Sequence, residues 1–302
     1  MIFFGEDVAA AGGVFKVTPG LLDEFGPNRV RDTPISEQAI VGAALGAAIT
    51  GIRPIAELMF GDFIFVAMDQ IVNQVAKYRY MSGGQFTAPL TIRAAQGAGA
   101  GFGTQHSQCV EAWLMGCPGL KVVVPSTPTD MYGLLRAAIR DDNPVFVLEH
   151  KMLYNMSEDV DDNMPNMSLG QAKIMREGTD ITIVATQMMV HRSLEASELL
   201  ATEGISAEVI DLRTLAPLDT GLILQSVSKT NRLVVVEEST HSAGWGGDIS
   251  SLMADEGVYL LDAPVKRVNM GNALVAYSPP LEDEVVPNVE RIATAIRDVV
   301  SA

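Results

Sequence analysis

The sequence has few basic residues for its length. Only 21 of its 302 residues are Lys or Arg, against 37 Asp or Glu, and the formal net charge is −16. Binding to nucleic-acid phosphates or to an anionic membrane surface requires a basic patch. The composition therefore argues against both kinds of partner, and we expect the acidity to serve solubility.

Cysteines and long apolar runs are also scarce. Cys109 and Cys117 are too few for a disulfide framework, and their spacing matches no zinc pattern, which indicates a reducing compartment. No apolar run approaches the ~20 residues that a membrane span needs. No signal peptide is recognisable at the N-terminus. We therefore expect neither a disulfide-stabilised secreted domain nor a membrane protein.

What the sequence does contain is an alternation of short apolar runs and helical stretches. This pattern is typical of a parallel sheet wrapped by helices. In the first half, strands are predicted at residues 2–4, 53–58, 90–94, 121–124 and 145–148, and helices at 39–49, 62–80, 110–115 and 129–140. Residues 151–178 break the alternation and are typical of a linker. A second unit follows, with strands at 180–186, 207–211, 232–237 and 265–269 and helices near 190–202 and 247–255.

Residues 32–37 place a carboxylate, Glu37, at the start of a run of small and apolar residues. Pro34 and Ser36 are helix start signals, and Gly51 is a stop signal. A helix that is apolar on all sides is expected to be buried. Burial would favour the protonated form of Glu37, which could then share its proton with a ligand. The alternative is that Glu37 is only a first-turn residue favoured by the helix dipole.

Three further features could carry chemistry. The glycines of residues 97–103 do not have the spacing of a dinucleotide-binding loop, but they could bring the backbone close to a ligand. His106 follows this loop and is either catalytic or a structural hydrogen-bonding residue. Phe63 follows the strand at 53–58, where it could stack on a ring in an α/β crevice or could be a core residue.

Gly42 and Gly46 lie four residues apart in the predicted helix at 39–49. Small residues at this spacing allow two helices to approach closely. The pair predicts a helix–helix contact between subunits or domains.

Several motifs together identify a family. They are Gly-Glu-Asp-Val at 5–8, Asp-Thr-Pro-Ile-Ser-Glu at 32–37, Arg-Pro-Ile-Ala-Glu at 53–57, Phe63 with Asp-Gln at 69–70, Lys-Tyr-Arg-Tyr-Met-Ser-Gly-Gly at 77–84, Gln-His-Ser-Gln at 105–108, Cys-Pro-Gly-Leu-Lys-Val at 117–122 and Asp-Leu-Arg-Thr at 211–214. In this order they resemble the β subunit of thiamine-diphosphate-dependent 2-oxoacid dehydrogenases, such as pyruvate, branched-chain 2-oxoacid and acetoin dehydrogenases. The resemblance covers nearly the whole chain.

The resemblance implies two three-layer α/β domains with mainly parallel sheets. A transketolase-like pyrimidine-binding domain would span residues 1–165, a linker 166–178, and a transketolase C-terminal-like domain 179–302. With the reducing compartment inferred above, the family implies a cytoplasmic protein of bacterial or archaeal type, with the mitochondrial matrix as the alternative.

The resemblance also implies site residues. Glu37 matches the catalytic glutamate that bonds the ring nitrogen of the cofactor's aminopyrimidine, and Glu6 matches a second carboxylate of this half-site. Phe63 matches the residue that stacks under the pyrimidine. His106 matches a histidine proposed to assist acyl transfer to lipoamide. The implied reaction is decarboxylation of a 2-oxo acid by activated thiamine diphosphate, followed by that transfer.

The diphosphate half of the cofactor site is implied to lie elsewhere. The chain has no Gly-Asp-Gly motif, which in this family begins the Mg²⁺ and diphosphate site. A separate α subunit would hold Mg²⁺ in an α2β2 assembly, and a lipoyl acyltransferase core would accept the product. The family also places a monovalent cation, K⁺, near Leu90, Ala138, Asp141 and Asn143.

The chain departs from the family in two places. Members carry a helix of roughly twenty residues before the first strand, whereas this chain begins inside that strand. Members also show a Pro-x-Pro within the segment that corresponds to residues 274–280, which here lacks it. A catalytically idle or truncated partner-binding subunit and a transketolase-like ketol-transfer chain are therefore the alternatives. The particular 2-oxo acid, or acetoin, is not predicted.

Overall fold

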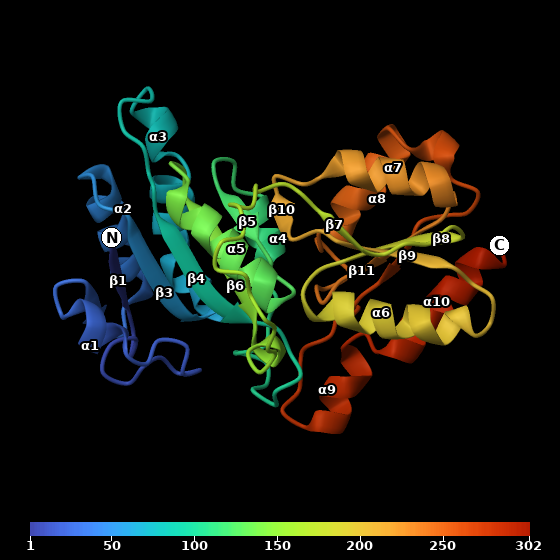
Figure 1. The fold of residues 1–302 in the computed structure, drawn as a ribbon, viewed down its shortest axis with the longest axis horizontal. Coiled ribbons are helices and arrows are strands. Elements are labelled where there is room, and N and C mark those ends of the chain that lie inside the picture. The colour runs from blue at the N-terminus through green and yellow to red at the C-terminus, as the bar shows by residue number, and fades with distance from the viewer.

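The computed structural model describes residues 1–302, which form two α/β units side by side (Figure 1). The first unit is built on a seven-stranded sheet in the order β10-β5-β6-β4-β3-β1-β2. Its strands are β1 (Ile2–Gly5), β2 (Val30–Asp32), β3 (Pro54–Phe60), β4 (Thr91–Gln96), β5 (Lys121–Val123), β6 (Val145–His150) and β10 (Thr214–Ala216). All neighbours are parallel except β10, which pairs antiparallel with β5.

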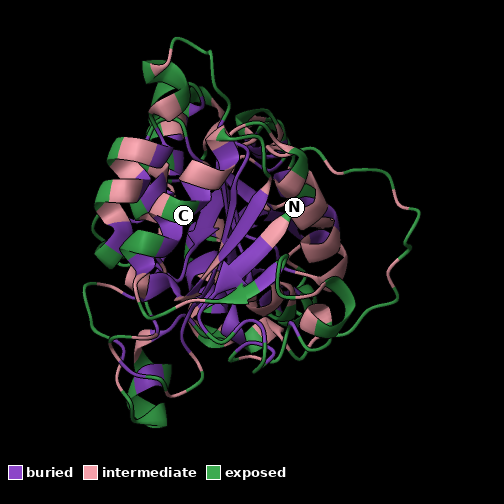
Figure 2. Cartoon of the chain, turned by 90° about the vertical axis from the view of Figure 1, so that its left-hand side faces the viewer, coloured by how far each residue is buried: buried purple, intermediate pink, exposed green.

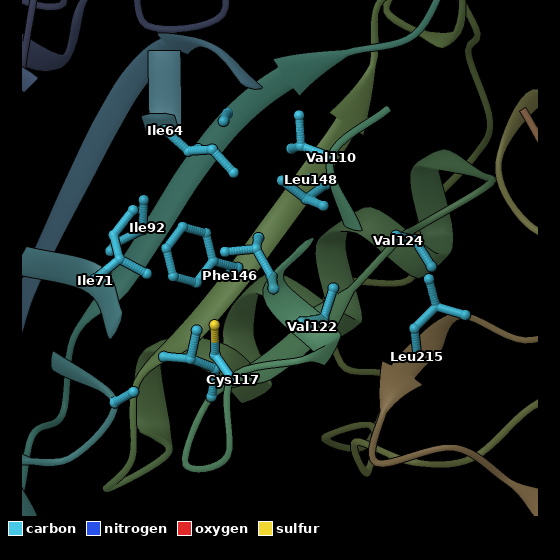
Figure 3. Packing of buried hydrophobic residues seen from close by; sticks show 14 of the residues in the cluster. Ile64, Ile71, Ile92, Val110, Cys117, Val122, Val124, Phe146, Leu148 and Leu215 are labelled. Atoms are coloured by element: carbon cyan, nitrogen blue, oxygen red, sulfur yellow. The ribbon is translucent and has the colours of Figure 1, made fainter. Parts of the chain in front are cut away.

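Helices cover both faces of this sheet. They are α1 (Leu21–Phe25), α2 (Glu37–Ile49), η1 (Gly61–Ala67), η2 (Gln70–Val75), α3 (Tyr78–Met81), α4 (Glu111–Met115), α5 (Pro128–Arg140) and η3 (Lys151–Leu153). On one face, Ile64 of η1 and Ile71 of η2 pack with Ile92 of β4 and Phe146 of β6 (Figure 3). On the other face, Leu134 of α5 packs in a separate cluster with strand residues of β5 and β6.

The second unit has a five-stranded sheet in the order β12-β11-β8-β9-β7. Its elements are β7 (Lys173–Arg176), β8 (Ile181–Ala185), α6 (Met188–Ala201), β9 (Ala207–Asp211), α7 (Thr220–Thr230), β11 (Leu233–Val236), α8 (Gly246–Asp255), η4 (Val258–Leu260), β12 (Lys266–Val268), α9 (Pro279–Val285) and α10 (Val289–Val300). Only β7 is antiparallel to its neighbour. Val235 of β11 packs with α7 and α8, whereas Val234 and Val236 pack with α6 and α10. A strand buried on both faces needs such a continuous apolar run.

The structure confirms the predicted fold class of two α/β units with mainly parallel sheets. Figure 2 shows buried central strands inside layers of helices whose outer faces are intermediate or exposed, and the edge strands β2, β7 and β12 include exposed residues. Each predicted strand is present to within three residues at either end. None of the helices combines the length and apolar character that crossing a bilayer demands.

Several elements were not predicted. They are β2, β7, β10, α1, α7, η3, η4, α9 and α10. β7 lies within residues 166–178, which the sequence predicted as a linker, and it pairs with β9 as an edge strand. β10 comes from the second half of the chain but completes the sheet of the first unit.

Two predictions about helices were wrong in detail. The helix predicted at 62–80 is divided into a 3₁₀ segment, a π segment and α3. The helix α2 is not buried on all sides, because Ala39 and Ala43 are exposed and Gly42 and Gly46 are half-buried. After Glu37 and Gln38 its composition is apolar, but its outer face carries mainly small residues, and the buried residues lie on the opposite side.

Candidate functional site at the carboxyl edge of the first sheet

Four predicted site residues follow four neighbouring strands. Glu37 lies after β2, Glu6 after β1, Phe63 after β3 and His106 after β4. Because these strands are parallel, their carboxyl ends meet at one edge of the sheet, where α/β proteins bind ligands. The strand order β2-β1-β3-β4 arranges these residues along the edge in the spatial order Glu37, Glu6, Phe63, His106.

The carboxylate end of this row is buried. Glu37 is 6% exposed and Glu6 is 8% exposed. Burial raises the pKa of Glu6, and the negative charges of Glu37 and Asp7 raise it further. Glu37 stands in the first turn of α2, and Ser36 is its N-cap residue. A pair of neighbouring carboxyl groups, one of which has a raised pKa, suits a ligand whose ring nitrogen can share a proton.

The middle of the row is aromatic. The ring of Phe63 is half-buried and lies edge-on to the rings of Phe60, 5.7 Å away, and His106, 5.4 Å away. Phe60 lies 4.8 Å from the His106 ring, also edge-on. Phe63 is therefore only partly buried, and the strand order places it next to Glu6 along the sheet edge. These residues fit the aminopyrimidine half of a thiamine cofactor, which combines a basic ring nitrogen with a flat face.

Residues around His106 connect the segments that follow β3 and β4. Asp62 of η1 accepts hydrogen bonds from the main chain and side chain of Gln108, at 3.3 and 2.8 Å. Its second oxygen, Oδ2, is buried without a partner, as is the hydroxyl of Ser107. Burial raises the pKa of Asp62. Unpartnered buried polar atoms are uncommon, and here they cluster beside Phe63 and His106.

The glycine loop before His106 is held by the second unit. Glu238 accepts a hydrogen bond from Ala98 N at 2.5 Å, and Glu282 of α9 accepts bonds from Gly99 N and Gly101 N at 2.7 and 3.1 Å. Thr104 donates to the carbonyl of Val275 at 2.9 Å. The loop is therefore clamped by carboxylates of the second unit.

The segment 274–280 also packs on this loop. A Cβ atom at Gly103 would lie 2.4 Å from the ring of Tyr277. The segment that departs from the family pattern thus contacts the loop that carries His106, in the same chain.

Lys151 belongs to this site and was not predicted. It is the first residue after β6, the strand beside β4, and its ammonium donates to the main-chain carbonyl of His106. The available signal was its position three residues after the strand predicted at 145–148. Residues 151–178 have the composition of a linker, which gives no indication of a functional side chain there.

The four residues predicted near a monovalent cation lie together at the opposite, amino-terminal edge of the sheet. Leu90 precedes β4, and Ala138, Asp141 and Asn143 precede β6. Asp141 is paired with Lys121 and also accepts bonds from Asn143, which together lower its pKa. A cation at this edge would support the fold rather than the chemistry at the carboxyl edge.

Comparison with known proteins agrees with the fold of two α/β units. Residues 1–157 match the family described as "Transketolase, pyrimidine binding domain", and residues 170–292 match "Transketolase, C-terminal domain". The chain is 47% identical to the β subunit of acetoin:2,6-dichlorophenolindophenol oxidoreductase from Bacillus subtilis, over 97% of this chain and 90% of that protein. It is 46% identical to pyruvate dehydrogenase E1 component subunit beta-2, mitochondrial, from Oryza sativa subsp. japonica, over 98% and 80%.

A solved structure shares the fold. It is described as "Split gene transketolase, inactive beta4 tetramer", with a TM-score of 0.81, 24% identity, and coverage of 99% of this chain and 92% of that one. Fold and site thus define a two-domain protein of the transketolase class. Within that class, the chain belongs to the family of β subunits of thiamine-diphosphate-dependent 2-oxoacid dehydrogenases, which includes the pyruvate and acetoin enzymes.

Proposed function

We propose that this chain provides the pyrimidine half of a thiamine diphosphate site in a 2-oxoacid or acetoin dehydrogenase, and that it is active only with an α subunit. The observation that supports this most directly is the row of Glu37, Glu6, Phe63 and His106 along one sheet edge. The reaction would be oxidative decarboxylation of a 2-oxo acid, or cleavage of acetoin, with lipoamide as the acyl acceptor.

Each residue of the row has a distinct task in this proposal. Bound thiamine diphosphate supplies the nucleophilic carbon and the electron sink that the reaction needs. Glu37 would hold a proton at the pyrimidine ring nitrogen, and Glu6 would keep a second carboxyl group beside it. Phe63 would support the ring face. His106, at the other end of the row, would move a proton during acyl transfer.

The diphosphate half would come from the partner. The chain has no Gly-Asp-Gly motif, and no group of three or more His, Cys, Asp or Glu side chains converges within it to hold a metal ion. We assign Mg²⁺ to the α subunit, the assembly to α2β2, and the acyl acceptor to a lipoyl acyltransferase core. K⁺ near Leu90, Ala138, Asp141 and Asn143 and a cytoplasmic location are further parts of the proposal.

Reconstitution tests the proposal. The chain would be purified alone and with the α subunit, and calorimetry would measure binding of thiamine diphosphate in the presence of Mg²⁺. Decarboxylation of several 2-oxo acids, and turnover of acetoin, would be followed with an artificial electron acceptor. We expect tight cofactor binding and turnover only in the complex. Tight binding by the isolated chain would contradict the half-site proposal.

A further inference from the structure

Lys151 is a buried cation with little to stabilise it. The residue is only 5% exposed, and no carboxylate lies within ion-pair distance of its ammonium group. Of the three N–H donors of the ammonium, one bonds to the His106 carbonyl. Burial lowers the pKa of Lys151, against the pull of more distant carboxylates such as Asp62, Glu238 and Glu282. A buried ammonium of this kind costs stability, so its presence calls for another explanation.

The ammonium contacts the surroundings of His106 from two sides. It donates to the His106 main chain, and it lies 5.5 Å from the ring centres of both Phe60 and Phe102. Phe60 in turn lies edge-on against the imidazole. Lys151 therefore fixes both the backbone of His106 and the aromatic ring that backs its side chain.

The turn that carries Lys151 is itself rigidly placed. His150 accepts a hydrogen bond from Met152 N through Nδ1, at 3.2 Å, so its Nε2 faces Glu238, at 2.9 Å, as a donor. The second oxygen of Glu238 accepts from Ala98 N in the glycine loop. One carboxylate of the second unit thus locates both segments that Lys151 joins.

We propose that Lys151 is a positioning residue, which holds His106 in the orientation needed for acyl transfer. This rests on the proposed function, because His106 has that task only in such an enzyme. Lys151 stands next to His106 in the row along the sheet edge and at the far end from Glu37. Substitution of Lys151 should therefore slow acyl transfer, which uses His106, and spare decarboxylation, which uses Glu37.

The test separates the two steps in the αβ complex. Decarboxylation is measured with an artificial electron acceptor, and acyl transfer is measured with lipoamide. For Lys151→Met we expect acyl transfer to fall roughly 10- to 100-fold more than decarboxylation, because a small misplacement of a proton-transfer group has effects of this size. Lys151→Arg should restore part of the loss. The control Lys266→Met, an exposed residue on β12, should change neither rate.

Two further measurements make the test decisive. In a His106→Ala background, Lys151→Met should add no further loss of acyl transfer, since it acts through that histidine. Hydrogen exchange of the isolated chain should show faster exchange in residues 103–109 for Lys151→Met than for Lys266→Met. Lys151→Gln, which keeps a donor without the charge, replaces the Met variant if that variant does not fold.

Opposite results would overturn the proposal. If Lys151→Met lowered decarboxylation and acyl transfer equally, Lys151 would serve the general fold. The same would follow if it lowered acyl transfer as much in the His106→Ala background as in the unmodified chain. Unchanged hydrogen exchange would show that it does not hold the loop. If the unmodified complex turned over no 2-oxo acid and no acetoin, the proposed function would fail, while the exchange experiment would still decide whether Lys151 holds His106.

Discussion

A single glycine, Gly97, lets two segments of the first unit pack closely at the site. Gly97 has φ +90° and lies against the His150 ring, and a Cβ atom there would come within 2.2 Å of Nε2. The same ring is bonded to Glu238 of the second unit. Only a residue without a side chain permits both the backbone conformation and this contact.

Gly97→Ala should therefore destabilise the protein more than a Gly→Ala substitution at a glycine with open space around it. Left-handed backbone costs an alanine about 1–2 kcal/mol, and overpacking against His150 should add about 1–3 kcal/mol to the loss in the free energy of unfolding. Gly83→Ala is the control, because Gly83 also has positive φ but nothing lies within 4 Å of a Cβ atom there. Denaturant unfolding of both variants would measure the difference, and equal losses would contradict the predicted clash.

The site residues differ in how far the sequence could predict them. Glu6, Glu37, Phe63 and His106 each lie in a recognisable motif, and their meeting at one edge follows from the parallel sheet. Glu238 and Glu282 could not be predicted in the same way. Their roles depend on the packing of the second unit on the glycine loop, and no local pattern encodes that contact.

At the scale of elements, α2 presents two different faces. Glu37, Ile40, Val41, Ala44, Leu45 and Ala48 are buried against the first unit. Gly46 lies on the outer face and has open space around it. Gly42 instead faces η2 of the same chain, and a Cβ atom at Gly42 would lie 3.2 Å from Oε1 of Gln70. The predicted close contact between helices is therefore an internal one at Gly42, and Gly46 alone is free for a partner.

Gly46→Leu should weaken assembly without unfolding the chain. The added side chain meets nothing within the chain, but it would hold a second helix away from the small-residue face. Light scattering on the co-expressed α and β chains would give the mass of the assembly, with Ala201→Leu at an exposed position of α6 as the control. Normal assembly of Gly46→Leu would show that this face is not part of a subunit interface.

At the scale of the whole molecule, buried polar groups join the two units. Gln96 donates to Glu111 and to Gln187 of the second unit, both at 2.9 Å. Asp211, at the end of β9, is fully buried near Asp130 of α5. Burial, with a further effect of the Asp130 charge, raises the pKa of Asp211 to about 7. The contact between the units should therefore depend on pH.

The sign of this dependence follows from proton binding. Between the ordinary pKa of 3.8 and about 7, only the folded state holds the proton on Asp211. Its contribution to the free energy of unfolding should thus fall by about 1.4 kcal/mol per pH unit over this window, and stay constant above it. Asparagine at this position cannot ionise. The Tm of Asp211→Asn minus the Tm of the unmodified chain should therefore increase as pH rises from 4 to 7.

Thermal unfolding of both proteins across this range measures the difference. Asp23→Asn, at an exposed position of α1, is the control and should show no such trend. A difference in Tm that does not change with pH would show that Asp211 titrates in its ordinary range.

The most direct test of the central claim concerns Glu37 in the αβ complex. Glu37→Gln keeps the shape of the side chain but cannot share a proton with the cofactor, so decarboxylation measured with an artificial acceptor should fall by about 10²–10⁴-fold. Light scattering should show normal assembly, and Glu24→Gln, an exposed change on α1, should leave the rate unaltered. A near-normal rate for Glu37→Gln would mean that Glu37 only begins a helix, and would contradict the account.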